Sequence, residues 1–586
     1  MTANLIDTDS LLLLDLGSIS TRALLFDQVR ERYRLLAAGS SRSTAGAPFN
    51  NVLEGIFSAL DSIQKVTGRT FLGKDQNLIK PSTEFGTGVD TCAATISTGP
   101  PLKVCIVGLL DDVSLDSARR LALTTYCTVV QTISLNDRQR AEDHIDSFLQ
   151  AHPDLVIVAG GTDGGASQSV MKLLESVGLA CYLMPETQRP VMLFAGNLEL
   201  REEVETNLST LLELHFTENI RPSLDFQQMD AARSKLAQIY TNIRCRQLSG
   251  VMELNGWVNG GLIPSPTGFG RVVSFLSKAS DSKKGVLGID VGASAVTIAS
   301  AIEGELTLGV YPQYGMGEST GKLLEYGNIS ELMSWLLHDF SEDQLREYLF
   351  TKSTYPASIP VTEAEINIEH ALARVVIRKA VRSLLDMMPE KAGHHGDGLL
   401  PWMEPLIVCG SVLSKAPTLG HCALMLLDGV QPTGVTPLLL DTHHLVSGLG
   451  AAAAVNSLLA IQILDSNSLV HLGTVISPFG AARPGTPVLR IKVTYENGQE
   501  TNFDIKYGTI EVLPIPHGKS VRLHLQPLHN FDIGMGAPGR GGTLRQVAGG
   551  VLGVIIDARG RPFKPPSDLR RRQELYRKWL WTFGVH

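Results

Sequence analysis

The chain of 586 residues is 44% hydrophobic and 19% charged, with a formal net charge of -8. Its length predicts several domain-sized units, and its negative charge argues against nucleic-acid binding, because nucleic-acid-binding domains are usually basic. The 7 cysteines are scattered without a Cys-x-x-Cys pair, which is typical of a reducing compartment. No apolar run approaches the roughly 20 residues of a membrane span. We therefore expect a cytoplasmic protein without nucleic-acid or membrane partners.

Near the N-terminus, an apolar strand leads into a short glycine-containing turn. Residues 11–26 predict a β-hairpin whose turn has the sequence Asp15-Leu16-Gly17-Ser18-Ile19-Ser20-Thr21-Arg22. Glycine lets a backbone approach an anion closely, and neighbouring N–H and hydroxyl groups can hold phosphate. A carboxylate at the end of a strand can hold hydrated Mg²⁺. On its own, the pattern is equally consistent with an ordinary hairpin.

After a helix predicted over 51–64, the region from about 102 to 197 alternates strands with helices. The predicted strands are 104–108, 128–133, 155–159 and 191–195, and the predicted helices are 114–123, 138–151 and 167–177. This rhythm predicts a parallel sheet with right-handed crossovers. We expect an inserted Rossmann-like or flavodoxin-like module.

The loop Gly160-Gly161-Thr162-Asp163-Gly164-Gly165 follows the third of these strands and precedes a helix. Open α/β sheets bind ligands at this end of their strands, and backbone N–H groups before a helix suit an anion. Contact with a ligand or a partner is therefore one interpretation of Gly160, Gly161, Thr162, Asp163 and Gly164. The other is a tight turn that requires glycine for its backbone conformation.

A second turn of the first type occurs in the middle of the chain, after a helix predicted over 228–245. An apolar strand from Gly285 leads into Asp290-Val291-Gly292-Ala293-Ser294. Internal duplication explains two acid-x-glycine turns, one in each half, better than chance does. A further apolar strand ends in a glycine turn at Gly410-Ser411.

The rest of the chain is helical first and β-rich later. Helices are predicted over 329–350, 364–387 and 447–463, and strands of period two over 488–495, 501–507 and 521–525. A final helix is predicted after Asp568. We expect one of its faces to pack on the core rather than on a membrane, and this face consists of Tyr576, Trp579, Leu580 and Phe583.

Two pairs of adjacent histidines, His394-His395 and His443-His444, raise the question of a metal site. Adjacent side chains point in different directions, and no Cys, Asp or Glu at suitable spacing completes a tetrahedral ligand set. Solvated or helix-capping roles are therefore favoured.

Several motifs follow one another in an order that resembles a known family. They are Asp15–Arg22, a strand over 102–110 followed by Asp111-Asp112, Val156–Gly165, Asn219-Ile220-Arg221-Pro222, Ile263-Pro264-Ser265-Pro266 and the Asp290 turn. Over residues 11–465 the chain is similar to the MutL/GlmL proteins, which are encoded beside adenosylcobalamin-dependent glutamate mutase. The stretch 159–165 is the most specific of the motifs. The region after about 475 resembles the β-rich domain of longer family members.

The resemblance implies a duplicated actin-like, ribonuclease H-like ATPase core, as in the superfamily of actin, heat-shock proteins and sugar kinases. On this basis, the first half spans 8–100, the inserted α/β module 101–215 and a helical connection 216–280. The second half spans 281–470, and a C-terminal β-rich domain with a terminal helix spans 475–586.

The resemblance also implies a site for ATP or ADP with Mg²⁺, held from both sides by the two turns. Asp15 and Asp290 would be the catalytic residues and would organise Mg²⁺ through water. The nucleotide-binding residues would be Gly17, Ser18, Thr21, Arg22, Gly292 and Ser294 at the phosphates, with Gly410 and Ser411 at the adenosine. Thr297, however, stands where the family has an aspartate, and Arg22 replaces a lysine. These departures favour nucleotide binding, with weak ATPase activity at most.

The implied function is that of an ATP-dependent chaperone or reactivating factor for an adenosylcobalamin-dependent mutase, with mutase subunits as partners. Because the chain lacks an Asp-x-His-x-x-Gly motif, we expect neither direct cobalamin binding nor mutase activity. One alternative is a degenerate scaffold that binds partners without turnover. A small-molecule kinase ranks last, because no acceptor-positioning aspartate is recognisable. The oligomeric state stays open.

Overall fold

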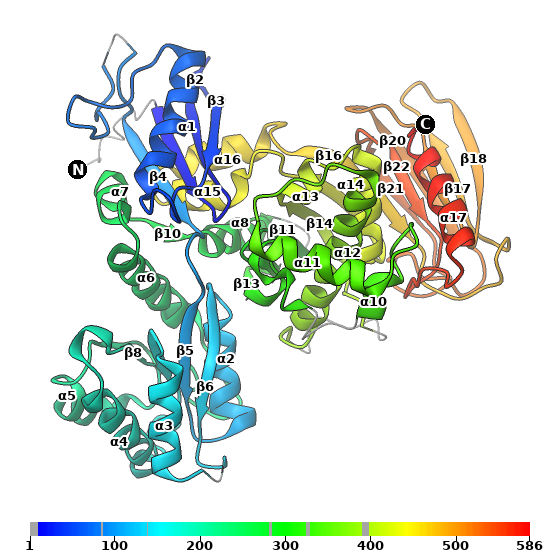
Figure 1. Ribbon diagram of the computed structural model, residues 1–586. Coiled ribbons are helices and arrows are strands. Elements are labelled where there is room, and N and C mark those ends of the chain that lie inside the picture. The colour runs from blue at the N-terminus through cyan, green and yellow to red at the C-terminus, as the bar shows by residue number, and fades with distance from the viewer. Residues whose placement is uncertain are drawn as a thin grey trace, which may run out of the picture. The chain divides into compact units, whose positions relative to one another are not determined.

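The computed structural model describes residues 10–83, 86–137, 139–279, 284–323, 329–389 and 398–585 (Figure 1). Two compact units can be separated along the chain. One unit consists of Met1–Ser10, Leu24–Ala38 and Gly268–His586, and the other consists of Leu11–Ala23 and Gly39–Thr267. The pair His394-His395 lies outside the described residues.

The N-terminal hairpin belongs to a five-stranded sheet with the order β10-β4-β1-β2-β3. Its strands are β1 (Ser10–Leu16), β2 (Ser20–Val29), β3 (Arg32–Arg42), β4 (Thr91–Ile96) and β10 (Ile263–Pro264). Strand β4 runs parallel to both β1 and β10. Every residue of β1 is buried, which explains its uninterrupted apolar run. The Asn51 side chain caps the start of helix α1 (Val52–Thr67), and the left-handed Gly68 follows its last residue.

The inserted module contains an entirely parallel five-stranded sheet with the order β6-β5-β7-β8-β9. Its strands are β5 (Leu102–Val107), β6 (Cys127–Ile133), β7 (Leu155–Val158), β8 (Val191–Phe194) and β9 (Leu214–Phe216). Numbered within the module, this order is 2-1-3-4-5, the flavodoxin-like arrangement. The predicted inserted parallel sheet is confirmed.

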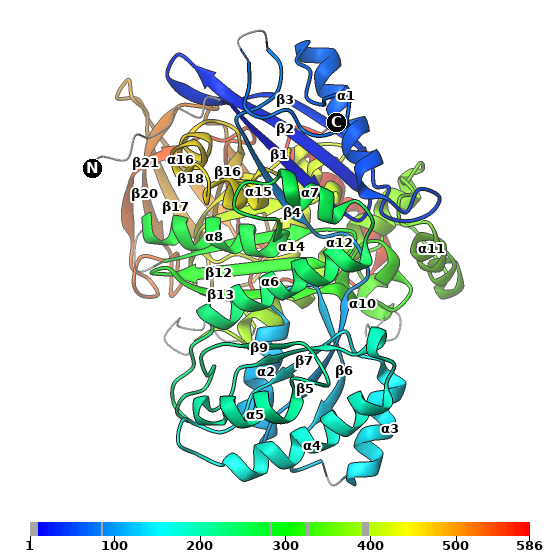
Figure 2. The same cartoon turned by 90° about the vertical axis from the view of Figure 1, so that its left-hand side faces the viewer.

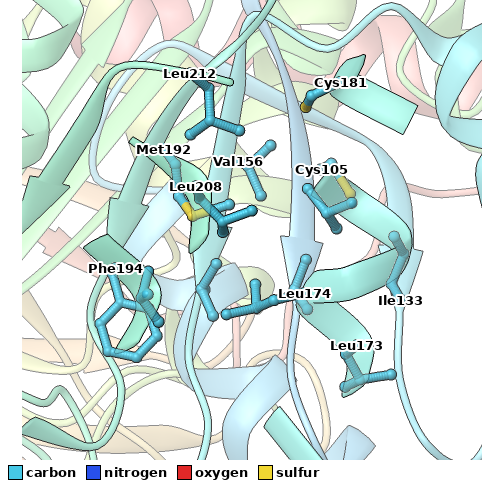
Figure 3. Close-up of a cluster of buried hydrophobic side chains, with 14 of the residues drawn as sticks. Cys105, Ile133, Val156, Leu173, Leu174, Cys181, Met192, Phe194, Leu208 and Leu212 are labelled. Carbon is cyan, nitrogen blue, oxygen red and sulfur yellow. The ribbon is translucent and has the colours of Figure 1, made fainter. Parts of the chain in front are cut away.

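Helices cover both faces of the module sheet. They are α2 (Asp116–Ala122), α3 (Ala141–Ala151), α4 (Ser167–Leu183) and α5 (Arg201–Leu208). Helices α3 and α4 lie side by side (Figure 2). Figure 3 shows the core beneath α4, where Cys105, Val156 and Met192 from three neighbouring strands meet Leu174 and Leu208. The next residue of each strand faces the other side and is also buried, so the sheet is apolar on both faces.

Helix α6 (Asp230–Gln247), predicted as a connection, is hydrogen-bonded to the amino edge of the module sheet. The Arg246 side chain pairs with Glu213 at 2.8 Å, and the Gln247 amide donates to Asp154 at 3.1 Å. Glu213 and Asp154 precede β9 and β7. The helix α6 is followed by α7 (Val251–Trp257) and α8 (Ser265–Ala279).

The second half is built on an eight-stranded sheet with the order β13-β12-β11-β14-β15-β16-β22-β19. Its first strands are β11 (Gly285–Val291), β12 (Val296–Ile302), β13 (Glu305–Tyr311), β14 (Met403–Cys409) and β15 (Gly434–Leu440). Numbered within each half, this sheet and the N-terminal one both have the order 3-2-1-4-5. The shared order is ribonuclease H-like, and it confirms the predicted duplicated actin-like core.

Two helices predicted as continuous are each divided. The first prediction, 329–350, corresponds to α10 (Ile329–Met333) and α11 (Glu342–Thr354), because Ser341 caps a new helix. The second, 447–463, corresponds to α15 (Leu445–Ala452) and α16 (Ser457–Asp465), since Asn456 accepts a hydrogen bond from the N–H of Leu459 and starts a new helix. The remaining helices of this region are α12 (Glu363–Leu385), α13 (Ser411–Ser414) and α14 (Leu419–Gly429).

The C-terminal region contributes to two sheets. Strands β16 (Val470–Ser477), β19 (Ile510–Leu513) and β22 (Val554–Asp557) extend the eight-stranded core sheet. Strands β17 (Pro487–Thr494), β18 (Glu500–Lys506), β20 (Ser520–Pro527) and β21 (Gly542–Ala548) form a separate four-stranded sheet. Helix α17 (Leu569–Thr582) packs on β19, with Trp579 buried as predicted. Among the described residues, no helix is long and apolar enough to cross a membrane.

Candidate nucleotide site

The first acid-x-glycine turn joins β1 to β2. The N–H of Gly17 donates to the carbonyl oxygen of Ser20 at 3.0 Å. A Cβ atom on Gly17 would lie 2.8 Å from that oxygen, so the turn requires glycine. Thr21 is buried beside Gly55, whereas Ser18 is partly exposed. Of these two predicted phosphate-binding hydroxyls, Ser18 is therefore the more accessible.

Asp15 is fixed at the end of β1 by two side-chain donors. One of its oxygens, Oδ2, accepts a hydrogen bond from Nη1 of Arg22 at 2.9 Å, and Oδ1 accepts one from Oγ1 of Thr95 at 2.9 Å. Thr95 lies directly opposite Asp15 in the parallel β1–β4 pair. The sequence prediction missed Thr95, although a threonine within the apolar strand 91–96 was a usable signal. Both predicted charged residues of this turn are thus paired with each other.

The second turn, between β11 and β12, has the same geometry as the first. The N–H of Gly292 donates to the carbonyl oxygen of Ala295 at 3.0 Å, and a Cβ atom on Gly292 would lie 2.9 Å from that oxygen. Ser294 is partly exposed. The equal hydrogen bonds show that the two halves share this turn in structure as well as in sequence.

The residue opposite the acid differs between the two turns. Asp290 lies opposite Thr297 in the antiparallel β11–β12 register, and Thr297 is only 3% exposed. Residues directly opposite in such a pair project from the same face of the sheet. The aspartate expected at 297 would therefore have stood beside Asp290. The equivalent position after Gly17 is Arg22.

Gly410 lies against the end of β11. It has a φ of 117°, and a Cβ atom there would overlap the carbonyl oxygen of Val291. The predicted adenosine turn is consequently next to the second acid-x-glycine turn, since β14 runs parallel to β11 with Cys409 opposite Asp290. Ser411 begins the short helix α13 and is exposed.

Asp441 follows the next parallel strand, β15, and the sequence prediction missed it. It is completely buried, and its carboxylate accepts hydrogen bonds from the N–H groups of His443 at 3.2 Å and Val446 at 2.8 Å. Burial raises the pKa of this carboxyl, although the backbone hydrogen bonds oppose the shift. The side chain of Asp441 thus caps the turn that contains His443 and His444. Asp290, Gly410 and Asp441 lie at one edge of the sheet.

A second segment that the prediction missed packs on the Gly292 turn. The N–H groups of Met316 and Gly317 donate to the carbonyl oxygens of Gly292 and Ala293 at 3.0 Å and 2.9 Å. The carbonyl side of this turn is therefore occupied by backbone hydrogen bonds. Glycines on either side of Met316 were the available signal in the sequence.

The glycine-rich loop after β7 is linked to another of the motifs. The Asn219 amide donates to the carbonyl oxygen of Gly161 at 3.0 Å and to Oδ1 of Asp163 at 2.9 Å. The N–H of Asp163 donates to the carbonyl oxygen of Pro222 at 3.2 Å. Gly161 and Gly164 both have a φ of 73°. The loop therefore has a structural role in joining the ends of β7 and β9.

The structure places the predicted residues in three groups. Asp15, Gly17, Ser18, Thr21 and Arg22 share the first turn, in the unit that contains the inserted module. The other unit contains Asp290, Gly292, Ser294, Gly410 and Ser411 at the neighbouring ends of β11 and β14. The loop from Gly160 to Gly164 belongs to the module sheet and forms a separate group.

The duplicated sheet order and the paired acid-x-glycine turns define a protein of the actin-like, ribonuclease H-like class. Residues 11–468 match the family described as MutL protein, and the chain belongs to this family. Protein MutL of Clostridium tetanomorphum is 24% identical over 399 residues, which cover 64% of this chain and 78% of that protein. The predicted family membership is confirmed.

Solved structures with low similarity include nucleotide-free acetone carboxylase and a glycerol dehydratase reactivase. The first is 12% identical with a TM-score of 0.29, and the match covers 86% of this chain and 81% of that one. The second is 10% identical with a TM-score of 0.27, and the match covers 76% of this chain and 100% of that one. The fold assignment depends on the strand orders of the two core sheets and not on these similarities.

Proposed function

We propose that this protein binds ATP or ADP with Mg²⁺ and acts as a nucleotide-dependent chaperone or reactivating factor for an adenosylcobalamin-dependent mutase of the glutamate mutase type. The observation that carries the nucleotide part is the repeated turn, with Gly17 and Gly292 in identical hydrogen-bonded geometry. Membership of the MutL protein family supports the link to the mutase.

In this proposal, each turn contributes phosphate-binding backbone and hydroxyl groups. Ser18 and Ser294 are the partly exposed hydroxyls. Asp15 and Asp290 would hold Mg²⁺ through water, because Mg²⁺ keeps several water ligands in protein sites. Gly410 and Ser411 would border the adenosine. The Arg22 guanidinium is paired with Asp15 at 2.9 Å. If it also contacts a phosphate, it must therefore bind the phosphate and Asp15 at the same time.

A second candidate function, a non-hydrolysing scaffold on the same fold, is favoured by two observations. Thr297 provides no carboxylate beside Asp290, and Arg22 already neutralises Asp15. Loss of a group that orients Mg²⁺ or the attacking water lowers the rate of phosphoryl transfer by orders of magnitude. The two candidates differ in turnover and not in nucleotide binding.

The test is calorimetric titration of the full chain with Mg-ATP and Mg-ADP, alongside phosphate release. We expect nucleotide binding by the wild type and at least about tenfold weaker binding by Asp15→Asn and Asp290→Asn, because each loses a charge-assisted interaction. Asp504→Asn, at an exposed carboxylate on β18, is the matched control. Absence of binding by the wild type contradicts the proposal. Binding without phosphate release selects the scaffold.

A further inference from the structure

The carboxyl edge of the module sheet carries exposed apolar side chains on the loops after four of its strands. Leu110 follows β5, Leu135 follows β6, Leu198 follows β8, and Leu224 and Phe226 follow β9. Their exposed fractions are 45% for Leu110, 44% for Leu135, 40% for Leu198, 60% for Leu224 and 55% for Phe226. We call these five residues the carboxyl-edge surface. Clustered exposed apolar groups of this kind mark interaction sites.

The loops after β7, β8 and β9 are hydrogen-bonded to one another. Oδ1 of Asp163, which accepts from Asn219, also accepts from the N–H of Leu198 at 3.3 Å. The amide of Gln227, next to Phe226, donates to Oγ of Ser117 at 3.0 Å, which connects this loop to α2. The part of the surface formed by Leu198, Leu224 and Phe226 is therefore held in place before any partner binds, and this lowers the entropic cost of association.

The same edge is rich in carboxylates. The exposed acidic residues on these loops and on the loop after β7 are Asp111, Asp112, Asp163, Glu199, Glu218 and Asp225. Arg221 is directed back to its own loop, where its Nη2 donates to the carbonyl oxygen of Leu224 at 2.7 Å. Apolar groups among carboxylates are complementary to a protein face that has apolar side chains among lysines and arginines.

A side chain occupies the position at which this fold type usually binds small ligands. That position is the crevice between the first and third strands of the module, β5 and β7. Leu109 packs against the module core, and its Cγ would lie 3.4 Å from a Cβ on Gly160. An apolar leucine side chain thus lies against Gly160 at this crevice, which favours a protein partner over a small polar ligand.

We propose that the carboxyl-edge surface is the docking site for a protein partner whose face combines apolar side chains with lysines and arginines. This inference rests on the proposed function, which supplies the partner, namely the adenosylcobalamin-dependent mutase. In this arrangement, the inserted module binds the mutase and the two acid-x-glycine turns bind the nucleotide. The loop from Gly160 to Gly164 then acts as a support that positions the docking residues.

The experiment measures binding of the full-length chain to the purified mutase at low and high salt. We expect Leu224→Asp and Phe226→Asp to weaken binding about 10-fold to 30-fold each, as for central apolar contacts of an interface. Asp111→Lys combined with Asp112→Lys is expected to slow association and to reduce the salt dependence of binding. The matched control is Tyr182→Asp, at an apolar side chain on α4 that is 66% exposed, and it should bind as the wild type does.

Circular dichroism and Mg-nucleotide titration verify that each variant is folded. If the wild type binds the mutase and the Leu224 and Phe226 variants bind it equally tightly, the docking inference is wrong and the proposed function stands. If Tyr182→Asp alone weakens binding, the partner docks on α4 instead. If the wild type binds nucleotide but not the mutase in any nucleotide state, both the docking inference and the mutase part of the proposed function are wrong.

Discussion

Thr297 faces Asp290 across the β11–β12 hairpin, at the place where the first hairpin pairs Arg22 with Asp15. The two halves thus keep the same turn but differ in the residue opposite the acid. One half has a cation there, and the other has a buried neutral hydroxyl. Neither half therefore has a second carboxylate beside its acid. For this reason we expect the protein to bind nucleotide but to hydrolyse it slowly.

Restoring the carboxylate at position 297 should increase turnover. We expect Thr297→Asp to raise the rate of phosphate release from Mg-ATP by about tenfold or more, because a positioned carboxylate can orient the attacking water. Thr297→Asn is the control, since it has nearly the same shape without the charge. An unchanged rate in Thr297→Asp, with nucleotide still bound, would show that hydrolysis is limited elsewhere.

The Asp15–Arg22 pair should contribute to stability because both side chains are largely buried. Their exposed fractions are 11% for Asp15 and 19% for Arg22. Arg22→Ala leaves a carboxylate with one donor fewer in a poorly solvated place, so we expect a loss of about 3 kcal/mol in unfolding free energy. Arg22→Lys should recover part of it. The measurement is urea unfolding, and equal stability of Arg22→Ala and wild type would contradict the prediction.

Gly410 should not tolerate a side chain. Its left-handed φ and its contact with the carbonyl of Val291 predict that Gly410→Ala destabilises the protein by about 2 kcal/mol or more. Gly46→Ala is the control, because a Cβ atom there meets nothing within 4 Å. Comparable unfolding midpoints for both variants would mean that the β11–β14 ends can rearrange.

A buried ionic group connects the core to the C-terminal segment. Oδ2 of Asp428 accepts from Nε of Arg374 at 2.8 Å, and Oδ1 accepts from Nη1 of Arg559 at 2.8 Å. Asp428→Asn weakens the pairing of two buried guanidiniums, so we expect a loss of about 3 kcal/mol in unfolding free energy. The exposed Arg490–Asp504 pair is the control, and Asp504→Asn should cost far less unfolding free energy, because water screens an exposed ion pair. Similar losses in the two variants would contradict this prediction.

The unfolding free energy should decrease as the pH is lowered below 7, because of His370 on α12. Burial, followed by the charges of Arg374 and His421, lowers the pKa of His370 from 6.5 to about 3. Below pH 6.5 the His370 imidazole is therefore protonated in the unfolded chain, whereas in the folded chain it stays neutral down to about pH 3. We expect this histidine to reduce the unfolding free energy by about 2 kcal/mol between pH 7 and pH 5.

Urea unfolding at several pH values checks this expectation. In His370→Gln the decline below pH 6.5 should become shallower, because the titrating group is gone. The exposed His338 offers the control, and His338→Gln should keep the slope of the wild type. A wild-type slope in His370→Gln would show that other groups account for the pH dependence.

Local sterics and apolar periodicity determined what could be predicted from the sequence. The turns at Gly17 and Gly292 require glycine because the carbonyl oxygen of the third residue after each glycine occupies the space of a Cβ atom. Such constraints depend only on residues that are close together in the chain. The alternation over 102–197 likewise indicated the parallel module. Helix ends were harder to predict, as the division at Asn456 shows.

Tertiary structure alone decided which distant residues meet. The partners Thr95 for Asp15 and Asn219 for Asp163 are 80 and 56 residues away in the chain, and no local pattern specifies such contacts. They follow from strand order, which sets which loops share an edge. The pairing of Arg22 with Asp15 was also invisible in the sequence, because it depends on side-chain burial at the end of β1. The sequence determined that two acid-x-glycine turns exist, and the fold determined which side chain lies beside each acid.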